Sequence, residues 1–119
     1  MTIEGISLEE YQLMKAGMMT ERTFQACVVK LAQSSGWLVY HTFDSRRSQP
    51  GYPDLHLVHA ATGRSLFREL KTQKGKTSPA QDKWILALTA AGHDVAVWRP
   101  SDWFGSPVIE TQLSLWVAP

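Results

Sequence analysis

Three side chains near the middle of the chain have the types and spacing of a metal-dependent site. Glu69 and Lys71 lie two positions apart in the segment FRELK, residues 67–71, and Asp54 directly follows Pro53. Side chains two positions apart in a β-strand point to the same face, so we expect Glu69 and Lys71 to share one. An acid and an amine so placed form either an ordinary surface pair or half of a metal site.

A hairpin would bring Asp54 to the same place. Segments 54–59 and 65–72 have strand character, and a turn near Ala61 and Thr62 separates them. Counting outward from that turn sets Asp54 about opposite Glu69, give or take the shift that a bulge would cause. Two carboxylates that share a site repel each other unless a cation intervenes, and hard divalent ions prefer such oxygen ligands. A bound metal would resolve the conflict.

Such a site would suit hydrolysis of a phosphodiester. In this interpretation Asp54 and Glu69 are direct metal ligands, and the backbone carbonyl of Leu70 is a candidate third ligand. Lys71 then lies beside the attacking water, where its ammonium stabilises developing negative charge while the metal lowers the pKa of the water. If Lys71 were instead the base, it would first have to lose its proton. The alternative is an exposed Glu69–Lys71 pair beside an unrelated turn aspartate.

Two helices are predicted ahead of the first strand. Ser7, with a glutamate three residues later, forms a capping-box pattern that begins a short helix, which Gly17 would end. Thr20 caps a longer helix over residues 21–35, and Gly36 would end it. Apolar residues at helical spacing predict that this helix packs on a sheet: Phe24, Cys27, Val28 and Leu31.

Three strands are predicted next. Residues 37–43 are rich in aromatic and β-branched side chains, and a polar loop over residues 44–52 follows them. Residues 54–59 form the second strand. A turn at residues 60–63 leads into the third strand, residues 65–72, so the second and third strands should pair as an antiparallel hairpin.

The rest of the chain predicts another helix and another strand. Ser78 as cap and Pro79 at the first helical position begin a helix that runs to about residue 91 and ends at Gly92. Its buried stripe should be Trp84, Ile85 and Leu88. Residues 94–99 form a short strand, and a short helix with an extended tail should follow Pro107. The order favours an α/β (α+β) fold in which helices pack on a mixed sheet.

Composition excludes several classes of protein. The 119 residues are 44% apolar and 19% charged, as in an ordinary single globular domain. A formal net charge of +1 does not demand an anionic partner, although it can hide a local basic patch. Cys27 is the only cysteine, which excludes an intramolecular disulfide and a multi-cysteine zinc site and fits a reducing intracellular setting.

Membrane and zinc hypotheses find no support in the sequence. No apolar run approaches the roughly 20 residues of a membrane span, and the acidic N-terminus does not match a signal peptide. We therefore expect a cytoplasmic protein with no membrane partner. The histidines lack paired metal-ligand spacing, which favours structural or surface roles over zinc binding for His41, His56, His59 and His93.

Taken together, the motifs resemble those of a nuclease family. The chain is similar to the PD-(D/E)xK nuclease superfamily and, within it, to the VRR-NUC family of small virus-type replication and repair nucleases. The resemblance covers the core from Glu21 to about Trp103 and rests on Glu21, GYPDL at 51–55, ELK at 69–71 and GKTSPAQ at 75–81. It implies a restriction-endonuclease-like core of order α-β-β-β-α-β within one VRR-NUC-like domain, residues 1–119.

The resemblance also implies a set of site residues. Asp54, Glu69 and Lys71 match the catalytic core, with Mg²⁺ or Mn²⁺ as the cofactor. Glu21 would add a further acidic group to the catalytic and metal-binding set, although as a first-turn acid it could simply favour the helix dipole. Gln81 matches the glutamine that accompanies this core, and its alternative is a solvated polar position.

Two loops that should border the site carry basic residues: Arg46, Arg47, Lys74 and Lys76. They could bind a DNA backbone without sequence readout, or they could serve only solubility. The resemblance implies a bacterial or phage setting, structured or branched DNA as substrate, and a homodimer, since two sites can address two strands. A module that binds nucleic acid without cleaving it and a nuclease that acts on RNA stay open as alternatives.

Overall fold

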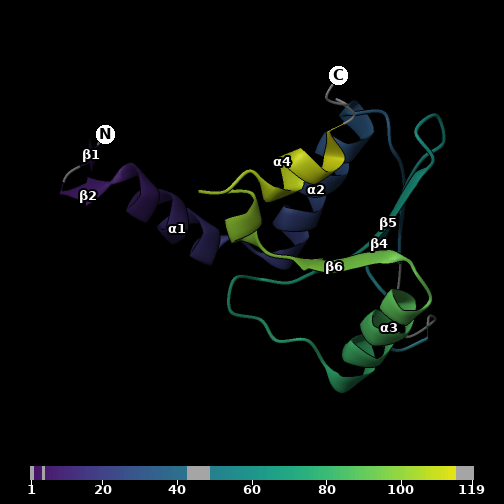
Figure 1. Cartoon of the computed structure of the whole chain (residues 1–119). Helices are drawn as coiled ribbons and strands as arrows, with labels where there is room; N and C mark the ends of the chain where they lie inside the picture. The colour runs from purple at the N-terminus through teal and green to yellow at the C-terminus, as the bar shows by residue number, and fades with distance from the viewer. Residues whose placement is uncertain (1, 4, 43–48, 115–119) are drawn as a thin grey trace.

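The fold is a mixed four-stranded sheet with helices on both faces (Figure 1). It is taken from a computed structural model, which describes residues 2, 3, 5–42 and 49–114. The strands stand in the order β3-β4-β5-β6, with β5 antiparallel to β4 and parallel to β6, and β3 antiparallel to β4. Their bounds are Leu38–His41, Leu55–His59, Arg64–Leu70 and Asp94–Trp98 for β3 to β6. The expected mixed sheet and the β4–β5 hairpin are confirmed.

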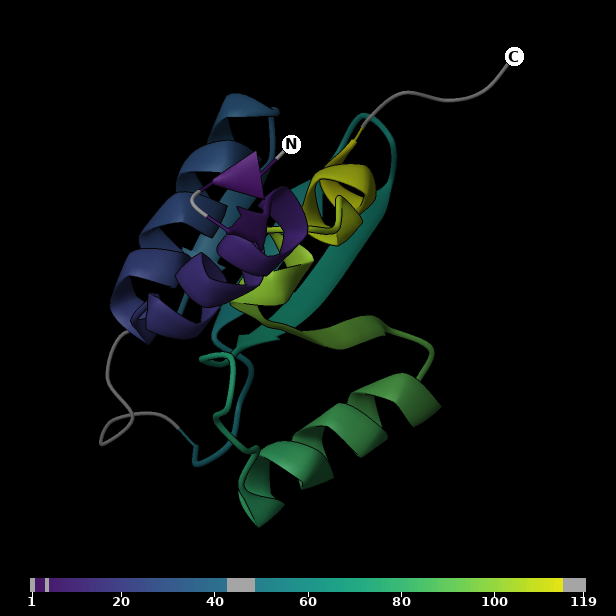
Figure 2. The same cartoon turned by 90° about the vertical axis from the view of Figure 1, so that its left-hand side faces the viewer.

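Helices α2 (Glu21–Ser34) and α4 (Val108–Leu113) cover one face of the sheet, and α3 (Pro79–Ala90) lies along the other (Figures 1 and 2). The 3-10 helix η1 (Pro100–Asp102) follows β6 directly. Ahead of this core, α1 (Leu8–Met18) and a two-stranded ribbon project to one side (Figure 1). The ribbon pairs β1 (Thr2–Ile3) with β2 (Ile6–Ser7) and was not expected from the sequence.

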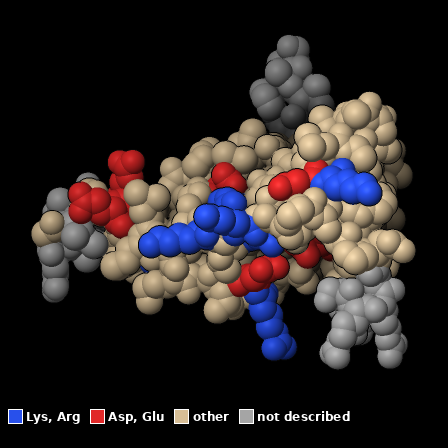
Figure 3. Space-filling model, turned by 90° about the horizontal axis from the view of Figure 1, so that it is seen from below, with Lys and Arg blue, Asp and Glu red and all other residues tan. Residues whose placement is uncertain are grey.

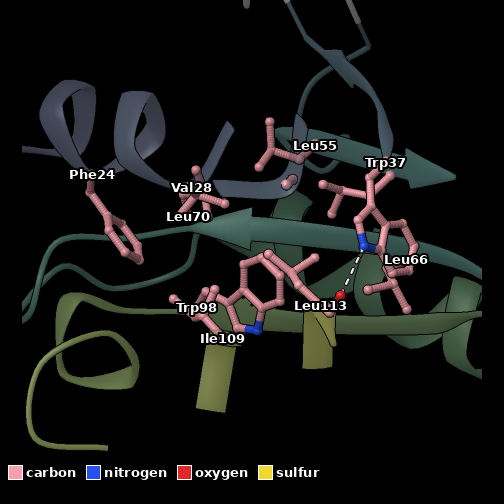
Figure 4. Packing of buried hydrophobic residues seen from close by; sticks show 11 residues of the cluster. Phe24, Val28, Trp37, Leu55, Leu66, Leu70, Trp98, Ile109 and Leu113 are labelled. Atoms are coloured by element: carbon pink, nitrogen blue, oxygen red, sulfur yellow. Dashed lines mark hydrogen bonds between the residues drawn. The ribbon is translucent and has the colours of Figure 1, made fainter. Parts of the chain in front are cut away.

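The hydrophobic core lies between the sheet and the α2–α4 layer (Figure 4). Trp37 is 3% exposed there, and its indole nitrogen donates a hydrogen bond to the carbonyl of Leu113 at 3.0 Å, which ties α4 to the start of β3. The other buried apolar members come from α2, α4 and three strands: Phe24, Val28, Ala32, Leu55, Leu57, Leu66, Leu70, Trp98, Ile109 and Leu113. The opposite face of the sheet is therefore free to carry polar residues under α3.

Arg68 is a buried charge on the core side of β5. Its Nη2 lies 2.8 Å from Oδ1 of Asp94 and donates to Oε1 of Gln112 at 3.1 Å, and the guanidinium lies 5.0 Å from the ring centroid of Trp98. These contacts fasten β6 and α4 to β5. The arginine that precedes Glu69 in the sequence thus has a structural role, because alternate side chains of a strand point to opposite faces.

Several local expectations were wrong. Gly17 lies inside α1 and does not end it, since the helix continues to Met18 and Met19 caps it. Cys27 on α2 is half-buried. The expected stripe of α3 is only partly buried, and no residue of that helix is fully buried, because a single helix shields its face of the sheet. Strand β5 ends at Leu70, so Lys71 lies just beyond it.

The ends of the remaining elements agree with the sequence to within a few residues. Ser7, Thr20 and Ser78 all accept the expected capping hydrogen bonds. The extended tail expected at the C-terminus lies outside the described residues. Within the part of the chain that the structure describes, no helix has the length and apolar character needed to cross a membrane.

Candidate active site

Asp54 and Glu69 meet where β4 begins and β5 ends. The last recorded pair of the two strands is Leu55 with Arg68, and the same register carried one position further sets Asp54 against Glu69. The carboxylate of Asp54 is held in place, because its Oδ2 accepts a hydrogen bond from the backbone nitrogen of Leu70 at 2.7 Å. The two acids therefore approach each other across the hairpin.

Glu69 is the most constrained acid of the site. It is 1% exposed, and its Oε1 accepts a hydrogen bond from Nε2 of Gln81 at 2.8 Å. Its Oε2 is buried without a hydrogen-bond partner among the described residues. Burial, followed by the negative charge and hydrogen bonding of Asp54, raises the pKa of Glu69 to about 8, although the charge of Lys71 opposes the shift. The ammonium of Lys71, 3.9 Å from Oε1, only partly offsets the burial and the charge of Asp54, so the pKa of this carboxyl stays above its ordinary value.

The donor atoms fit a hard divalent cation. An orphaned, buried carboxylate oxygen beside a second carboxylate is an arrangement that such an ion stabilises. The register also sets Leu70 opposite Pro53, whose nitrogen carries no hydrogen, so the strand ladder offers no donor to the carbonyl of Leu70 there. Among the described residues, no three His, Cys, Asp or Glu side chains form a metal-binding group. The candidate metal ligands are thus the carboxylates of Asp54 and Glu69 and the backbone carbonyl of Leu70.

Lys71 adds a cation to this side of the sheet. Its side chain is 15% exposed, and its Nζ lies 3.9 Å from Oε1 of Glu69. The backbone of Lys71 is fixed by the neighbouring strand, because its nitrogen donates to the carbonyl of Trp98 at 3.1 Å. Beyond Lys71 the chain turns sharply, and Nη1 of Arg99 donates to the carbonyls of Thr72 at 2.8 Å and Gly75 at 2.6 Å. The turn is therefore anchored to the end of β6.

Gln81 is held by the first turn of α3. Its Oε1 accepts from the backbone nitrogen of Ser78 at 2.8 Å, and its own backbone nitrogen donates to Oγ of Ser78 at 3.2 Å, which completes a capping box. With Oε1 engaged in this way, the amide nitrogen of the side chain is the atom that reaches Glu69. The sequence left open whether Gln81 contacts the site, and the structure brings it there.

Gly51 presses the loop before β4 against the same turn of α3. Its φ is +85°, and a Cβ at this position would lie 2.3 Å from the carbonyl carbon of Ala80 and 2.7 Å from the nitrogen of Gln81. Only a glycine can approach another backbone so closely in this conformation. The loop that leads to Asp54 and the turn that positions Gln81 thus form one packed unit.

Glu21 approaches the site from the other layer. It is the first residue of α2 and is exposed. Partial burial raises its pKa, the charge of Asp54 raises it further, and Lys71 lowers it. These interactions place Glu21 within electrostatic range of both residues, but it does not complete a three-ligand metal group with Asp54 and Glu69. Its position in the first turn of α2 also fits the helix-dipole alternative.

Of the four basic residues expected in the loops beside the site, the structure describes two. Lys74 and Lys76 are exposed in the turn that Arg99 anchors. Figure 3 shows basic and acidic side chains side by side across the middle of the molecule, seen from the side on which α3 lies. Arg46 and Arg47, the other basic residues expected here, lie outside the described residues.

Several residues that contact the site or pack beside it were not predicted from the sequence. Arg99 contacts the turn after Lys71 although 24 residues separate it from Gly75, and a lone arginine after a strand carries no signal of such a contact. Gly51 is part of the motif GYPDL, but the motif does not indicate that this glycine packs on the backbone of Ala80. Two of the four histidines pack beside the site, where the ring of His56 stacks on Phe67 at 4.1 Å and His93 meets Phe67 edge-on at 5.4 Å.

Both the sequence and the fold of the chain are similar to those of one family of known proteins. The sequence model of one family, described as the VRR-NUC domain, matches residues 6–102. Among solved structures, a chain titled "VRR_NUC domain" superposes with a TM-score of 0.60 at 23% identity, covering 82% of this chain and 97% of its own. A second, titled "VRR_NUC domain protein", gives a TM-score of 0.57 at 21% identity, with 79% and 86% covered. No curated protein matches the chain.

Proposed function

Because the chain belongs to the VRR-NUC domain family, which is a family of nuclease domains within the PD-(D/E)xK superfamily, we propose that it is a divalent-metal-dependent endonuclease. Its substrate is structured or branched DNA, such as the four-way junctions of replication, repair and recombination. Residues 1–119 act as one nuclease domain. One observation carries the proposal: Glu69, which lies beside Asp54 and has Nζ of Lys71 3.9 Å from its Oε1, keeps a buried Oε2 that has no hydrogen-bond partner among the described residues.

The carboxylates of Asp54 and Glu69, together with the carbonyl of Leu70, would hold Mg²⁺ or Mn²⁺. Glu21 contributes a further acidic group from the start of α2, through its influence on the same site. When bound, the metal supplies a water of lowered pKa and neutralises charge on a phosphoryl oxygen. Burial of Glu69 and Leu70 would keep bulk water from their side of the site, which would strengthen electrostatic interactions there.

The remaining groups act on the phosphate and on the ligands. The ammonium of Lys71 stabilises the negative charge that develops on the phosphate oxygens during attack. Gln81 orients Glu69 by donating to Oε1, which leaves Oε2 as the oxygen available for coordination. Contacts from Lys74 and Lys76, with Arg46 and Arg47, bind the substrate backbone irrespective of its sequence.

A cleavage assay tests this function. The purified protein is incubated with labelled single-stranded, duplex, flap and four-way DNA, and with the corresponding RNA, in Mg²⁺, Mn²⁺ or a chelator. We expect cutting of branched DNA with either metal and none with the chelator. Binding without cutting under all conditions would support the non-cleaving module, and cutting of RNA alone would support the ribonuclease.

Two variants assign the roles. Lys71→Ala and Asp54→Asn should each abolish cutting, while the fold and the salt-sensitive binding of DNA are retained. Lys15→Ala on the remote helix α1 is the control and should cut like the wild type. Unchanged cleavage in either test variant would remove that residue from the mechanism.

We also propose that the protein acts as a homodimer, so that two sites address two strands of one substrate. Light scattering should give twice the monomer mass of 13.4 kDa at working concentrations. The monomer mass across that range would contradict the pairing.

A further inference from the structure

A groove borders α3 on the side next to the proposed active site. Its volume is about 340 Å³, and it lies between residues 80–87 of the helix and the turn that precedes Gly51. It is lined by Gln49, Pro50, Ala80, Lys83, Trp84 and Ala87. None of these residues has a part in the metal site described above.

The groove is rigidly coupled to the catalytic residues. Ala80 and Lys83 flank Gln81 in the helix, and Gln81 donates to Glu69 at 2.8 Å. The opposite wall is coupled as well, because Gly51, directly after Pro50, packs on the backbone of Ala80. Four residues of chain lead from Pro50 to Asp54, which is at most about 14 Å when fully extended. A ligand in the groove would therefore lie within a few nucleotides of the scissile phosphate.

The lining has the chemistry of a nucleotide site. The ring of Pro50, the indole of Trp84 and the methyl groups of two alanines form apolar walls. Trp84 is half-buried and meets Tyr52 edge-on, with 4.9 Å between ring centroids, which holds the indole in place. Stacking on an aromatic side chain binds a base without regard to its identity, because every base has a π-face.

A cation completes this lining. Lys83 is exposed and makes no ion pair with any residue that the structure describes. Its neighbour Asp82 is engaged elsewhere, since Oδ1 of Asp82 accepts a hydrogen bond from Oγ1 of Thr77 at 2.6 Å. A purely apolar partner would gain nothing from this ammonium, whereas a nucleotide carries both a flat base and a phosphate.

We propose that the groove is a nucleotide subsite that binds one unpaired base of the substrate strand. The base packs against Trp84 and Pro50, the amide of Gln49 faces its edge, and Lys83 contacts the adjoining phosphate. The subsite rests on the proposed function, because it takes the substrate of that same active site. It has a consequence for substrate choice: a base buried in the groove cannot be paired, so DNA with an unpaired base a few nucleotides from the cut is preferred over an intact duplex.

Filling the groove tests the proposal. Ala87→Phe places a ring inside it, and Thr89→Phe is the matched control, because Thr89 is exposed on the same helix about 160° away around its axis. Binding is measured in a chelator, which separates it from cleavage, with oligonucleotides that carry the fluorescent base 2-aminopurine at successive positions. Thermal unfolding of both variants checks that they are folded.

We expect the wild type and Thr89→Phe to change the fluorescence at one position a few nucleotides from the cut. Ala87→Phe should lose that change and bind about tenfold more weakly, as the loss of one base stack predicts. Lys83→Ala should retain the fluorescence change but weaken binding to all oligonucleotides alike. Equal fluorescence and affinity in Ala87→Phe and Thr89→Phe would overturn the subsite, as would a change of molecular mass in Ala87→Phe alone, which indicates a contact between two copies.

Cleavage of a branched substrate in Mg²⁺ separates this inference from the proposed function. If no protein cuts but the position-specific fluorescence change persists, the subsite stands and the nuclease assignment fails. If Ala87→Phe cuts branched and duplex DNA with the preference of the wild type, the subsite fails and the nuclease assignment stands.

Discussion

At the scale of single residues, the site concentrates negative charge that the fold alone does not neutralise. Glu69 is buried next to Asp54, and the contact that the structure gives Nζ of Lys71 is with Oε1 at 3.9 Å, whereas Oε2 has no hydrogen-bond partner among the described residues. A buried polar atom without a partner costs about 1–3 kcal/mol of stability. A ligand would satisfy such an atom, and the proposed metal would do so for Oε2 of Glu69.

The raised pKa of Glu69 predicts how the metal-free protein responds to pH. The unfolded chain ionises this carboxyl near 4.5 and the folded protein near 8, so the folded state holds an extra proton between these values. Stability contributed by this group is therefore present below pH 4.5 and is lost as pH rises towards 8, by up to about 1.4 kcal/mol per unit. We expect Glu69→Gln to remove this loss and to melt at a higher temperature than the wild type at pH 8 in a chelator.

Melting curves in chelator across this pH range provide the measurement, and Glu110→Gln, at an exposed position on α4, is the control. Mg²⁺ should raise the melting temperature of the wild type at pH 8 but not that of Glu69→Gln. Parallel pH profiles for the wild type and Glu69→Gln would show that the buried carboxyl is stabilised by other means.

Gln81 takes part in the cap of α3 and also donates a hydrogen bond to Glu69, for which we propose a positioning role, and two variants separate these contacts. Gln81→Met preserves the size of the side chain but removes the donor to Glu69, so cleavage should fall about tenfold or more. Ser78→Ala removes the capping hydroxyl, which should lower the free energy of unfolding by about 1 kcal/mol, yet it leaves the Gln81–Glu69 hydrogen bond in place. Measuring both the cleavage rate and the free energy of unfolding of each variant distinguishes the two roles. An equal loss of cleavage in both variants would mean that Gln81 acts only through the cap.

At the scale of elements, the side chains of β5 alternate between the hydrophobic core on one face of the sheet and the proposed active site on the other. Leu66, Arg68 and Leu70 face the core, whereas Phe67 and Glu69 face α3. The helix α3 has no fully buried residue, so the hydrophobic effect alone positions it weakly. Polar contacts and the close approach of Gly51 set its first turn, and that turn carries Gln81.

The contact between Gly51 and Ala80 can be tested against a glycine of similar backbone conformation. Gly51 has φ of +85° and Gly92 has φ of +90°, but a Cβ at Gly92 would meet no atom within 4 Å. Both Gly→Ala variants lose about 1–2 kcal/mol to left-handed strain. Gly51→Ala should lose about 1–3 kcal/mol more through overpacking and should also cut more slowly, because α3 must shift. Cleavage and denaturant unfolding of the two variants provide the comparison, and similar values for both would refute the coupling.

At the scale of the whole molecule, attraction of nucleic acid must come from local charge. The formal net charge is +1, which gives little long-range steering, so the proposed function assigns the electrostatic part of binding to the exposed lysines beside the site. The turn that holds them is fixed by Arg99 from the end of β6. These two lysines thereby form a basic edge of defined position beside the site.

This arrangement predicts the salt dependence of binding. Lys74→Ala and Lys76→Ala should each reduce the slope of log affinity against log salt by about 0.9, as expected for the loss of one phosphate contact to duplex DNA. Lys15→Ala should leave the slope unchanged, because Lys15 lies on α1, 5.5 Å from the ring centroid of Tyr11. Titrations in chelator at several salt concentrations measure the slopes. An unchanged slope in both test variants would assign the two lysines to solubility alone.

Much of the fold could be predicted because its signals are local. Capping residues at Ser7, Thr20 and Ser78 mark where helices begin, and the turn near Ala61 defines the β4–β5 register, from which the approach of Asp54 to Glu69 follows. The end of α1 and the burial of α3 were less predictable, since neighbours distant in sequence decide whether a helix continues through a glycine and how far a helix face is covered.

By itself, the sequence determined the order of the helices and strands from α1 to α4 and the pairing that brings two carboxylates together, because side-chain alternation and turn length define the geometry of a hairpin within a short stretch of chain. Only the tertiary structure decided that Gln81 reaches Glu69, that Arg99 anchors the turn after Lys71, and that Gly51 packs on α3 beside a groove. These contacts join segments whose separation in the sequence carries no information on distance in space, since they depend on how the layers pack.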